Sequence, residues 1–201
     1  FLNTKPKYDH KQAQFGIVQG GTYEDLRIES SKFVTDLDFE GIAIGGLSVG
    51  EPTELMYEMT DLNTDYLPEN KPRYLMGVGK PENLLHAIAR GIDMFDCVLP
   101  TRNARNGQIF TRNGYINIRN AKWKNHQKPL DPDFPTDLCQ KYKMSYIHHL
   151  FRNDELLGLE LASLHNLTFY LWLMNSVKER IENDTFHNWY EDKAEVLATK
   201  I

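Results

Sequence analysis

Short runs of apolar residues alternate with longer segments of helical periodicity along the first hundred positions of the chain. Four apolar runs have the length of a strand, at residues 15–19, 41–44, 73–76 and 94–99. Helical spacing of apolar positions follows the first three runs, from Thr22 onward, over 52–63 and over 81–90. Strands that are apolar nearly throughout are typical of a parallel sheet covered by helices. The pattern therefore predicts an α/β fold.

The second half of the chain has a different pattern. Two short apolar runs, 108–111 and 115–118, flank Arg112-Asn113-Gly114, and an Asn-Gly pair between such runs predicts a β-hairpin. Prolines mark residues 129–137 as a loop. Helices are expected at about 137–151, 154–183 and 185–199. The packed face of the second of these helices is expected to include Leu156, Leu159, Leu167, Tyr170, Leu171, Met174 and Val177.

Small and polar residues gather where the predicted strands end. Glycines follow the first three strands, and Asp96 lies near the end of the fourth. We expect Pro100 to stop the fourth strand, because proline has no backbone donor, and an arginine-rich loop to follow it. In a (β/α)8 barrel the active site lies at this edge of the sheet, and phosphate sites favour the loops after strands seven and eight. An open doubly wound sheet is the structural alternative.

Asp96 is a carboxylate inside an otherwise apolar run. A buried carboxylate lowers stability unless something uses or satisfies it, and a lone strand Asp is most often hydrogen-bonded to a neighbouring loop. The arginines that follow favour a functional role for Asp96 over this structural one. A carboxylate beside an anion-binding loop suggests chemistry on a phosphate-bearing substrate.

Charge is unevenly distributed along the 201 residues. The formal net charge of −5 argues against indiscriminate nucleic-acid binding, but residues 101–128 contain no Asp or Glu and seven basic residues. Such a segment favours selective phosphate contact, although a solvated basic face without a ligand has the same composition. No apolar run reaches the length of a membrane span. The two cysteines, Cys97 and Cys139, provide no disulfide framework, which favours a reducing cytoplasm.

Four blocks of the sequence resemble, in the same order, blocks of the queuine tRNA-ribosyltransferases, which are also called tRNA-guanine transglycosylases. The blocks are Phe-Gly-Ile-Val-Gln-Gly-Gly at 15–21, Gly-Gly-Leu-Ser-Val-Gly-Glu at 45–51, Tyr-Leu-Met-Gly-Val-Gly-Lys-Pro at 74–81 and Phe-Asp-Cys-Val-Leu-Pro-Thr-Arg at 95–102. The resemblance implies the C-terminal half of a (β/α)8 TIM barrel at 1–107, with four strand–helix units, followed by a hairpin and helical appendage at 108–201. Because such enzymes are longer and this chain begins at Phe1, we expect it to be part of a longer protein.

By this resemblance, Asp96 is the nucleophile that displaces guanine from the ribose of tRNA and holds the tRNA covalently until a 7-deazaguanine base takes its place. The residues that match the family's base-binding positions are Gln19, Gly45, Gly46, Leu47, Val49, Glu51 and Met76. Val49 resembles the bacterial form, which favours the small precursor preQ1 over queuine. The family's general acid/base carboxylate is expected outside this chain, so the chain alone is expected to show no turnover.

The resemblance also implies contacts to the anticodon loop of a tRNA with a wobble guanine. Single-stranded loops are natural targets because their bases can be turned out and read. The residues that match the family's tRNA contacts are Gly77, Val78, Gly79, Lys80, Pro81, Glu82, Asn83, Thr101, Arg102, Asn103, Ala104 and Arg105. A homodimer of the full-length enzyme is implied as well, with no membrane partner.

Two alternative functions remain open. The first is a non-catalytic tRNA-binding or dimer partner subunit of the same family, which would have no need of Asp96 as a nucleophile. The second is an unrelated phosphate-binding barrel enzyme. Such an enzyme would bind small phosphates and would form no covalent adduct with tRNA.

The sequence departs from the family at its zinc motif, Cys-x-Cys-x-x-Cys with a distant His. The corresponding positions hold Phe134, Thr136, Cys139 and His165, so only Cys139 and His165 remain as ligands. Structural zinc sites usually have four Cys or His ligands, and we therefore expect no metal and no other cofactor. A mixed site completed by Asp133 and Asp137 is the alternative, although carboxylates are scarce in structural zinc sites. Phe134 is expected to fill the space by apolar packing.

Overall fold

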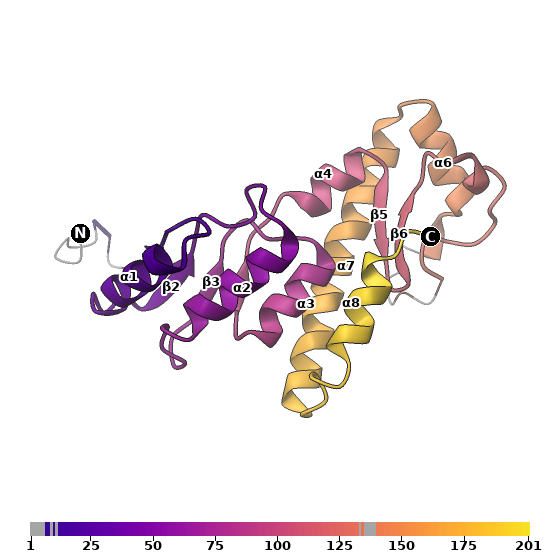
Figure 1. Cartoon of the computed structure of the whole chain (residues 1–201). Helices are drawn as coiled ribbons and strands as arrows, with labels where there is room; N and C mark the ends of the chain where they lie inside the picture. Colours follow the sequence, from indigo (N-terminus) through magenta and orange to yellow (C-terminus); the bar gives the residue numbers. More distant parts are fainter. Residues whose placement is uncertain (1–6, 9, 11, 133, 135–139) are drawn as a thin grey trace. The chain divides into compact units, whose positions relative to one another are not determined.

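The computed structural model of the chain describes residues 7–8, 10, 12–132, 134 and 140–201. The chain divides into two compact units (Figure 1). Unit 1 comprises Phe1–Val78 and Arg90–Asp96, and unit 2 comprises Gly79–Ala89 and Cys97–Ile201. The division at residue 107 into a barrel half and an appendage stays a prediction.

Unit 1 contains a four-stranded parallel sheet built from β1 (Phe15–Val18), β2 (Gly41–Ile44), β3 (Arg73–Leu75) and β4 (Met94–Phe95). The strands lie side by side in the order of the sequence. A doubly wound sheet reverses its strand order at a switch point, whereas sequential order is what the wall of a (β/α)8 barrel has. The predicted α/β fold, with a parallel sheet and alternating strands and helices, is confirmed.

Two helices of unit 1, α1 (Glu24–Thr35) and α2 (Thr53–Thr64), lie beside the sheet (Figure 1). They pack on each other and bury a polar pair, because the Ser31 hydroxyl donates to Asn63 Oδ1 over 3.0 Å. All four residues of β2 are buried. The layer formed by α1 and α2 supports the loops at the carboxyl ends of β1 and β2.

The segment after β4 differs from the sequence-based expectation. The fourth strand is two residues long, and α4 (Leu99–Arg105) stands where an arginine-rich loop was expected. Pro100 lies in the first turn of this helix and does not end a strand. Proline suits that turn because its φ is already helical and no backbone donor is needed there. The predicted fourth strand is present but ends at Phe95 instead of Leu99, and the predicted loop over 101–105 is wrong.

Unit 2 consists of helices around a hairpin. Its elements are α3 (Pro81–Ala89), α4, β5 (Gln108–Thr111), β6 (Gly114–Asn117), the 3-10 helix η1 (Ala121–Trp123), α6 (Met144–Arg152), α7 (Leu156–Glu182) and α8 (Tyr190–Ala198). β5 and β6 pair antiparallel, which confirms the predicted hairpin. The long helix predicted over 154–183 is confirmed by α7.

The helix α7 packs against α4, β5 and α6 and forms the centre of unit 2 (Figure 1). Its buried face includes one amide side chain, Asn166. Asn166 Oδ1 accepts a hydrogen bond from the Phe110 amide at 3.0 Å, and Nδ2 donates to the carbonyls of Pro100 at 2.9 Å and Gln108 at 3.0 Å. One side chain thus ties the start of α4 to β5. No helix in the described part of the chain is long and apolar enough to cross a membrane.

Candidate functional site

Asp96 follows β4, and two donors within unit 1 hold one of its carboxylate oxygens. Oδ1 accepts a hydrogen bond from the Tyr74 hydroxyl at 2.6 Å and another from the Gly77 amide at 3.0 Å. Gly77 has a φ of +74°, a backbone conformation that favours glycine. The Asp96 residue is exposed. This arrangement orients the carboxylate through Oδ1.

The same donors stabilise the ionised form of Asp96. The hydrogen bond from Tyr74, followed by that from Gly77, lowers the pKa of the Asp96 carboxyl below its ordinary value. The contact raises the pKa of the Tyr74 hydroxyl, so the proton stays on the tyrosine. Sequence reasoning missed Tyr74. The signal was its position two residues before Met76, since residues at this spacing share one face of a strand.

Gln19 lies against the Gly45–Gly46 turn. β1 and β2 are paired along their whole length, up to Val18 opposite Ile44, so the residues that follow them are neighbours. Gly46 has a φ of +69°, and a Cβ built on it would lie 2.6 Å from Gln19 Oε1. A Cβ on Gly45 would lie 2.7 Å from Gln19 Nε2. Glycine at both positions leaves room for the amide where it lies, and the structure brings three predicted base-binding residues together.

Arg27 on α1 supports this turn, and the sequence analysis missed it. Its side chain is completely buried. Nη1 donates to the Gly45 carbonyl at 2.8 Å, Nη2 to the Gly46 carbonyl at 3.2 Å and Nε to the Gly21 carbonyl at 2.7 Å. Burial lowers the pKa of this guanidinium. Arg27 thus links the loop after β1 to the turn after β2.

Glu51 closes the loop that follows β2. Its carboxylate accepts hydrogen bonds from the Ser48 amide and, at 3.0 Å, from the Val49 amide. Burial raises the pKa of Glu51, but the backbone amides of this loop lower it by more, so the net shift is downward. Leu47 is buried, whereas Val49 is 82% exposed. Of these two predicted base-binding residues, Val49 presents its side chain at the surface.

Met76, the last predicted base-binding residue, follows β3. Its amide donates to the Ile44 carbonyl at 3.1 Å. Its side chain lines an apolar cavity of about 280 Å³ in unit 1, together with Ala13, Phe15, Ile17, Ala43, Tyr74 and Met94. Met76 therefore lies on the same face of the sheet as Tyr74, the residue that holds Asp96.

The predicted RNA-binding residues differ in how far they reach the surface. Those with exposed or half-buried positions are Gly77, Lys80, Glu82, Thr101, Arg102, Asn103 and Arg105. Those that are buried are Val78, Gly79, Pro81, Asn83 and Ala104. Gly77 and Val78 belong to unit 1, and the others belong to unit 2. The buried members can offer a ligand little more than their backbone.

Gly79 is anchored on α7 within unit 2. The Tyr170 hydroxyl donates to the Gly79 carbonyl at 2.5 Å. Burial raises the pKa of Tyr170, so this hydroxyl stays protonated. The backbone that leads into α3 is thereby held in place, with exposed Lys80 directly after the anchor.

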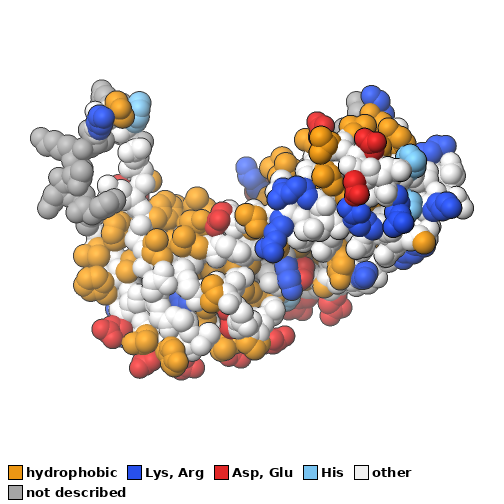
Figure 2. Space-filling view, turned by 90° about the horizontal axis from the view of Figure 1, so that it is seen from above, with side chains coloured by type: hydrophobic (Ala, Val, Ile, Leu, Met, Phe, Trp, Pro, Cys, Tyr) orange, Lys and Arg blue, Asp and Glu red, His pale blue; other side chains and the backbone are white. Residues whose placement is uncertain are grey.

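α4 presents two arginines to solvent. Arg102 and Arg105 are exposed, while Ala104 is completely buried in a hydrophobic cluster with Ile109 and Leu161. Within the described residues, no hydrogen bond or ion pair holds either guanidinium group. Figure 2 shows Lys and Arg side chains gathered on the face of unit 2 seen from above. Unpaired guanidinium groups on a basic face are suited to phosphate oxygens.

Two of the four zinc-motif positions lie among the described residues, and Thr136 and Cys139 lie outside them. Phe134 is buried, with its ring centroid 5.7 Å from that of His165 and 5.8 Å from that of Trp172. His165 Nε2 donates to a backbone carbonyl at 2.8 Å. The described residues contain no group of three or more His, Cys, Asp or Glu that could hold a metal ion. Because an aromatic ring stands where the motif has a thiolate, these residues do not fit the family's zinc site.

We expect the purified protein to retain no stoichiometric zinc after dialysis, and a chelator to leave its melting temperature unchanged. Phe134→Ala, in contrast, should destabilise the protein by about 3–5 kcal/mol, because it empties a buried aromatic position. Metal analysis and thermal unfolding check these outcomes. Stoichiometric zinc that is lost in Cys139→Ser would contradict the expectation.

Comparison with known proteins assigns this chain to a family. The sequence profile described as "Queuine tRNA-ribosyltransferase" matches residues 2–199. The chain belongs to the queuine tRNA-ribosyltransferase family. The sequence-based recognition of this family is thus confirmed.

Curated queuine tRNA-ribosyltransferases from several bacteria are similar to this chain. The one from Thermoanaerobacter pseudethanolicus is 53% identical over 178 residues, which cover 89% of this chain and 48% of the relative. The one from Aliivibrio fischeri is 51% identical over 190 residues, covering 94% and 51%. The one from Rickettsia bellii is 55% identical over 169 residues, covering 84% and 47%. The chain spans about half the length of the curated queuine tRNA-ribosyltransferases it matches.

Proposed function

We propose that this chain supplies the nucleophile and part of the base pocket of a tRNA-guanine transglycosylase. The enzyme would exchange guanine at the anticodon wobble position for a 7-deazaguanine, preQ1 or queuine. The observation that carries the proposal is the Asp96 carboxylate, held through one oxygen by Tyr74 and Gly77. Base exchange through a covalent intermediate needs a carboxylate that is ionised, oriented and accessible, and Asp96 has these three properties.

In the proposed reaction, Asp96 Oδ2 attacks C1′ of the wobble ribose. The bond between C1′ and guanine N9 breaks, its electron pair leaves with guanine, and guanine takes up a proton. The incoming base then loses its N9 proton and attacks C1′, and Asp96 leaves as a carboxylate. The lowered pKa of Asp96 favours this second step, because a weakly basic carboxylate leaves more readily. Two inversions at C1′ retain the configuration of the ribose.

Gln19 and the Gly45–Gly46 backbone are proposed to read the base. The Gln19 amide offers both a donor and an acceptor, and guanine and its 7-deaza analogues offer the complementary groups. Both glycines let the backbone approach a ligand closely. Exposed Val49 is proposed to favour preQ1 over the bulkier queuine.

Arg102 and Arg105 are proposed to bind phosphates of the tRNA anticodon loop. Replacing both with Ala should weaken tRNA binding about tenfold or more, because two charge-assisted contacts are lost. The slope of log K against log salt should also become less steep by about 1.5 for two single-strand phosphates. Binding measured at several salt concentrations tests this, with Lys178→Ala, at an exposed position of α7, as the control. Unchanged affinity and slope would refute the assignment.

The proposed function is tested by trapping a covalent adduct with a tRNA transcript that has a wobble guanine, detected on a denaturing gel. The protein used here and in the experiments below is the full-length enzyme, called the intact protein, because the general acid/base carboxylate is expected outside this chain. A non-catalytic tRNA-binding or dimer partner subunit would bind the transcript without forming an adduct. A barrel enzyme for small phosphates would do neither. Homodimerisation and action in the cytoplasm, which the family resemblance implies, belong to the same proposal, and light scattering of the intact protein tests the dimer.

A further inference from the structure

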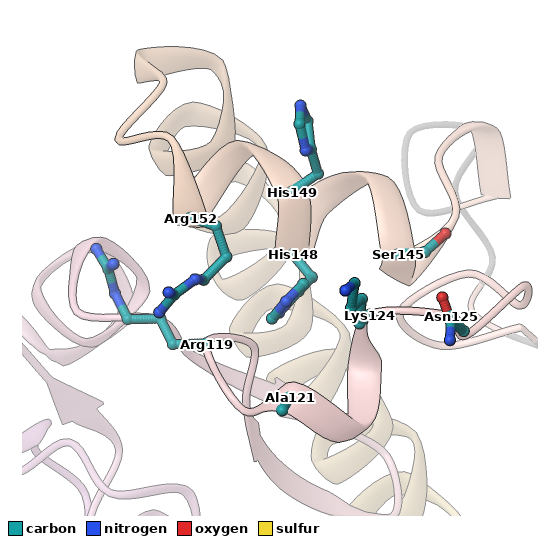
Figure 3. A pocket seen from close by; sticks show the side chains of 8 residues that line it. All are labelled: Arg119, Ala121, Lys124, Asn125, Ser145, His148, His149 and Arg152. Carbon is teal, nitrogen blue, oxygen red and sulfur yellow. The ribbon is translucent and has the colours of Figure 1, made fainter.

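A second basic site lies within unit 2, between the chain that follows β6 and the helix α6 (Figure 3). It is a cavity of about 570 Å³. Its polar lining includes Arg119, Lys124, Asn125, Ser145, His148 and Arg152, and none of the described residues that line it is an Asp or a Glu. No lining residue matches a base-binding or tRNA-binding position of the family resemblance.

The inner part of this cavity is ordered by contacts to the backbone. Arg119 Nη1 donates to the Phe151 carbonyl at 2.9 Å, and its guanidinium lies 5.2 Å from the Phe151 ring centroid. His148 is only 6% exposed, and its Nδ1 donates to the Ile118 carbonyl at 2.7 Å. This bond leaves Nε2 as the ring nitrogen that a ligand can meet. Arg119 forms an ion pair with Asp154, whose carboxylate lies 3.7 Å from Nη1. Asp154 is exposed, and it is a weak partner because water screens its charge.

Two further cations complete the cavity. Within the part of the chain that the structure describes, no hydrogen bond or ion pair holds the Lys124 ammonium or the Arg152 guanidinium. Figure 3 shows Arg152 extending from α6 toward Arg119, while the ring of His149 points the opposite way. Like charges that converge with only one exposed, water-screened acid nearby repel each other, and an anion bound between them removes this repulsion.

The lining indicates which anion fits. Arg, Lys, Ser and Asn are the side chains that bind phosphate oxygens in nucleic-acid complexes. Among the described lining residues, the only aromatic side chains are two histidines and the only aliphatic one is Ala121. Arg119 and Lys124 also belong to the acid-free segment 101–128, which contains Arg102 and Arg105. We propose that this cavity binds a backbone phosphate of RNA, an inference that rests on the proposed tRNA function.

The test compares two double variants of the intact protein. Lys124→Ala/Arg152→Ala removes the unpartnered cations of the cavity, and Lys178→Ala/Lys200→Ala removes the same charge from exposed positions of unit 2. The probe is a tRNA transcript with a wobble guanine. The cavity variant should bind it about tenfold more weakly than the control variant, with a salt slope smaller by about 1, the value for one phosphate. Lys124→Glu, which reverses one charge, should weaken binding as well.

Several outcomes would overturn the proposal. One is equal affinity of the two double variants at every salt concentration. Another is that calorimetry detects binding of inorganic phosphate that is lost in the cavity variant, while the affinity for RNA stays unchanged. The cavity would then bind free phosphate and not an RNA phosphate. These readouts need no turnover. Absence of the Asp96 adduct, with RNA binding and the variant effect intact, would refute only the proposed function, whereas an intact protein that binds no RNA would refute both.

Discussion

Asp96→Asn is expected to abolish the covalent tRNA adduct and to lower base exchange by roughly a thousandfold or more, because removal of a nucleophile commonly has effects of this size. Asparagine keeps an oxygen where Oδ1 lies, so the contacts from Tyr74 and Gly77 can persist and the fold is expected to hold. What disappears is the ionised oxygen that is proposed to attack the ribose. A denaturing gel with labelled tRNA measures the adduct, and exchange of labelled guanine measures turnover.

Tyr74→Phe is the matched comparison, because it keeps the nucleophile and removes only one hydroxyl. In the proposed reaction Asp96 acts in its ionised form, so activity is expected to fall as the pH falls through the pKa of that carboxyl. The Tyr74 hydrogen bond lowers this pKa. Its removal therefore raises the pKa and moves the acid limb of the pH–rate profile to higher pH. An adduct that persists in Asp96→Asn, or an acid limb that stays in place in Tyr74→Phe, would speak against these roles.

Arg27→Ala should lower the free energy of unfolding by about 3–5 kcal/mol, the largest stability effect expected for a single substitution in unit 1. The guanidinium is completely buried and donates to the carbonyls of Gly21, Gly45 and Gly46. Alanine would leave these carbonyls without their donor and would open a cavity. Because the turn beside Gln19 would lose its support, base binding should weaken together with stability.

Urea unfolding of the intact protein measures this effect. Lys32→Ala is the control, since Lys32 lies on the same helix but is exposed, with its ammonium 5.1 Å from the Tyr66 ring centroid. Loss of that cation–π contact should change stability by about 1 kcal/mol or less. Arg27→Lys should recover only part of the loss, because one ammonium cannot reach three carbonyls at once. A change below about 1 kcal/mol in Arg27→Ala would contradict the expected role.

The residues at the strand ends show which features could be predicted from neighbouring residues in the sequence. Gln19, Gly45 and Gly46 were predicted as base-binding residues, and the structure places them together because successive parallel strands end side by side. Their role in binding a base stays a prediction. Pro100 shows the limit, since proline both ends strands and begins helices. The Asn166 side chain is distant in the sequence but donates a hydrogen bond to the Pro100 carbonyl, and this contact helps to hold Pro100 in a helix.

The sequence by itself determined the alternation of strands and helices, the hairpin and the long helix α7, because apolar periodicity and turn residues act over a few neighbouring positions. It determined the buried face of α7 only in part: Val177 is buried as expected, and Leu159, Tyr170 and Met174 are half-buried. Leu156, Leu167 and Leu171 were expected in the core but are 80%, 43% and 67% exposed, whereas polar Asn166 is completely buried.

Only the tertiary structure decided where the buried and orienting polar groups belong. Asn166 is buried because it satisfies backbone groups at Pro100, Gln108 and Phe110, far from it in the sequence. Tyr74 likewise reaches Asp96 across a whole helical connection. A buried polar side chain is stable only where hydrogen-bond partners lie beside it. The packing of the complete fold, and not the local sequence pattern, determines which loops bring those partners together.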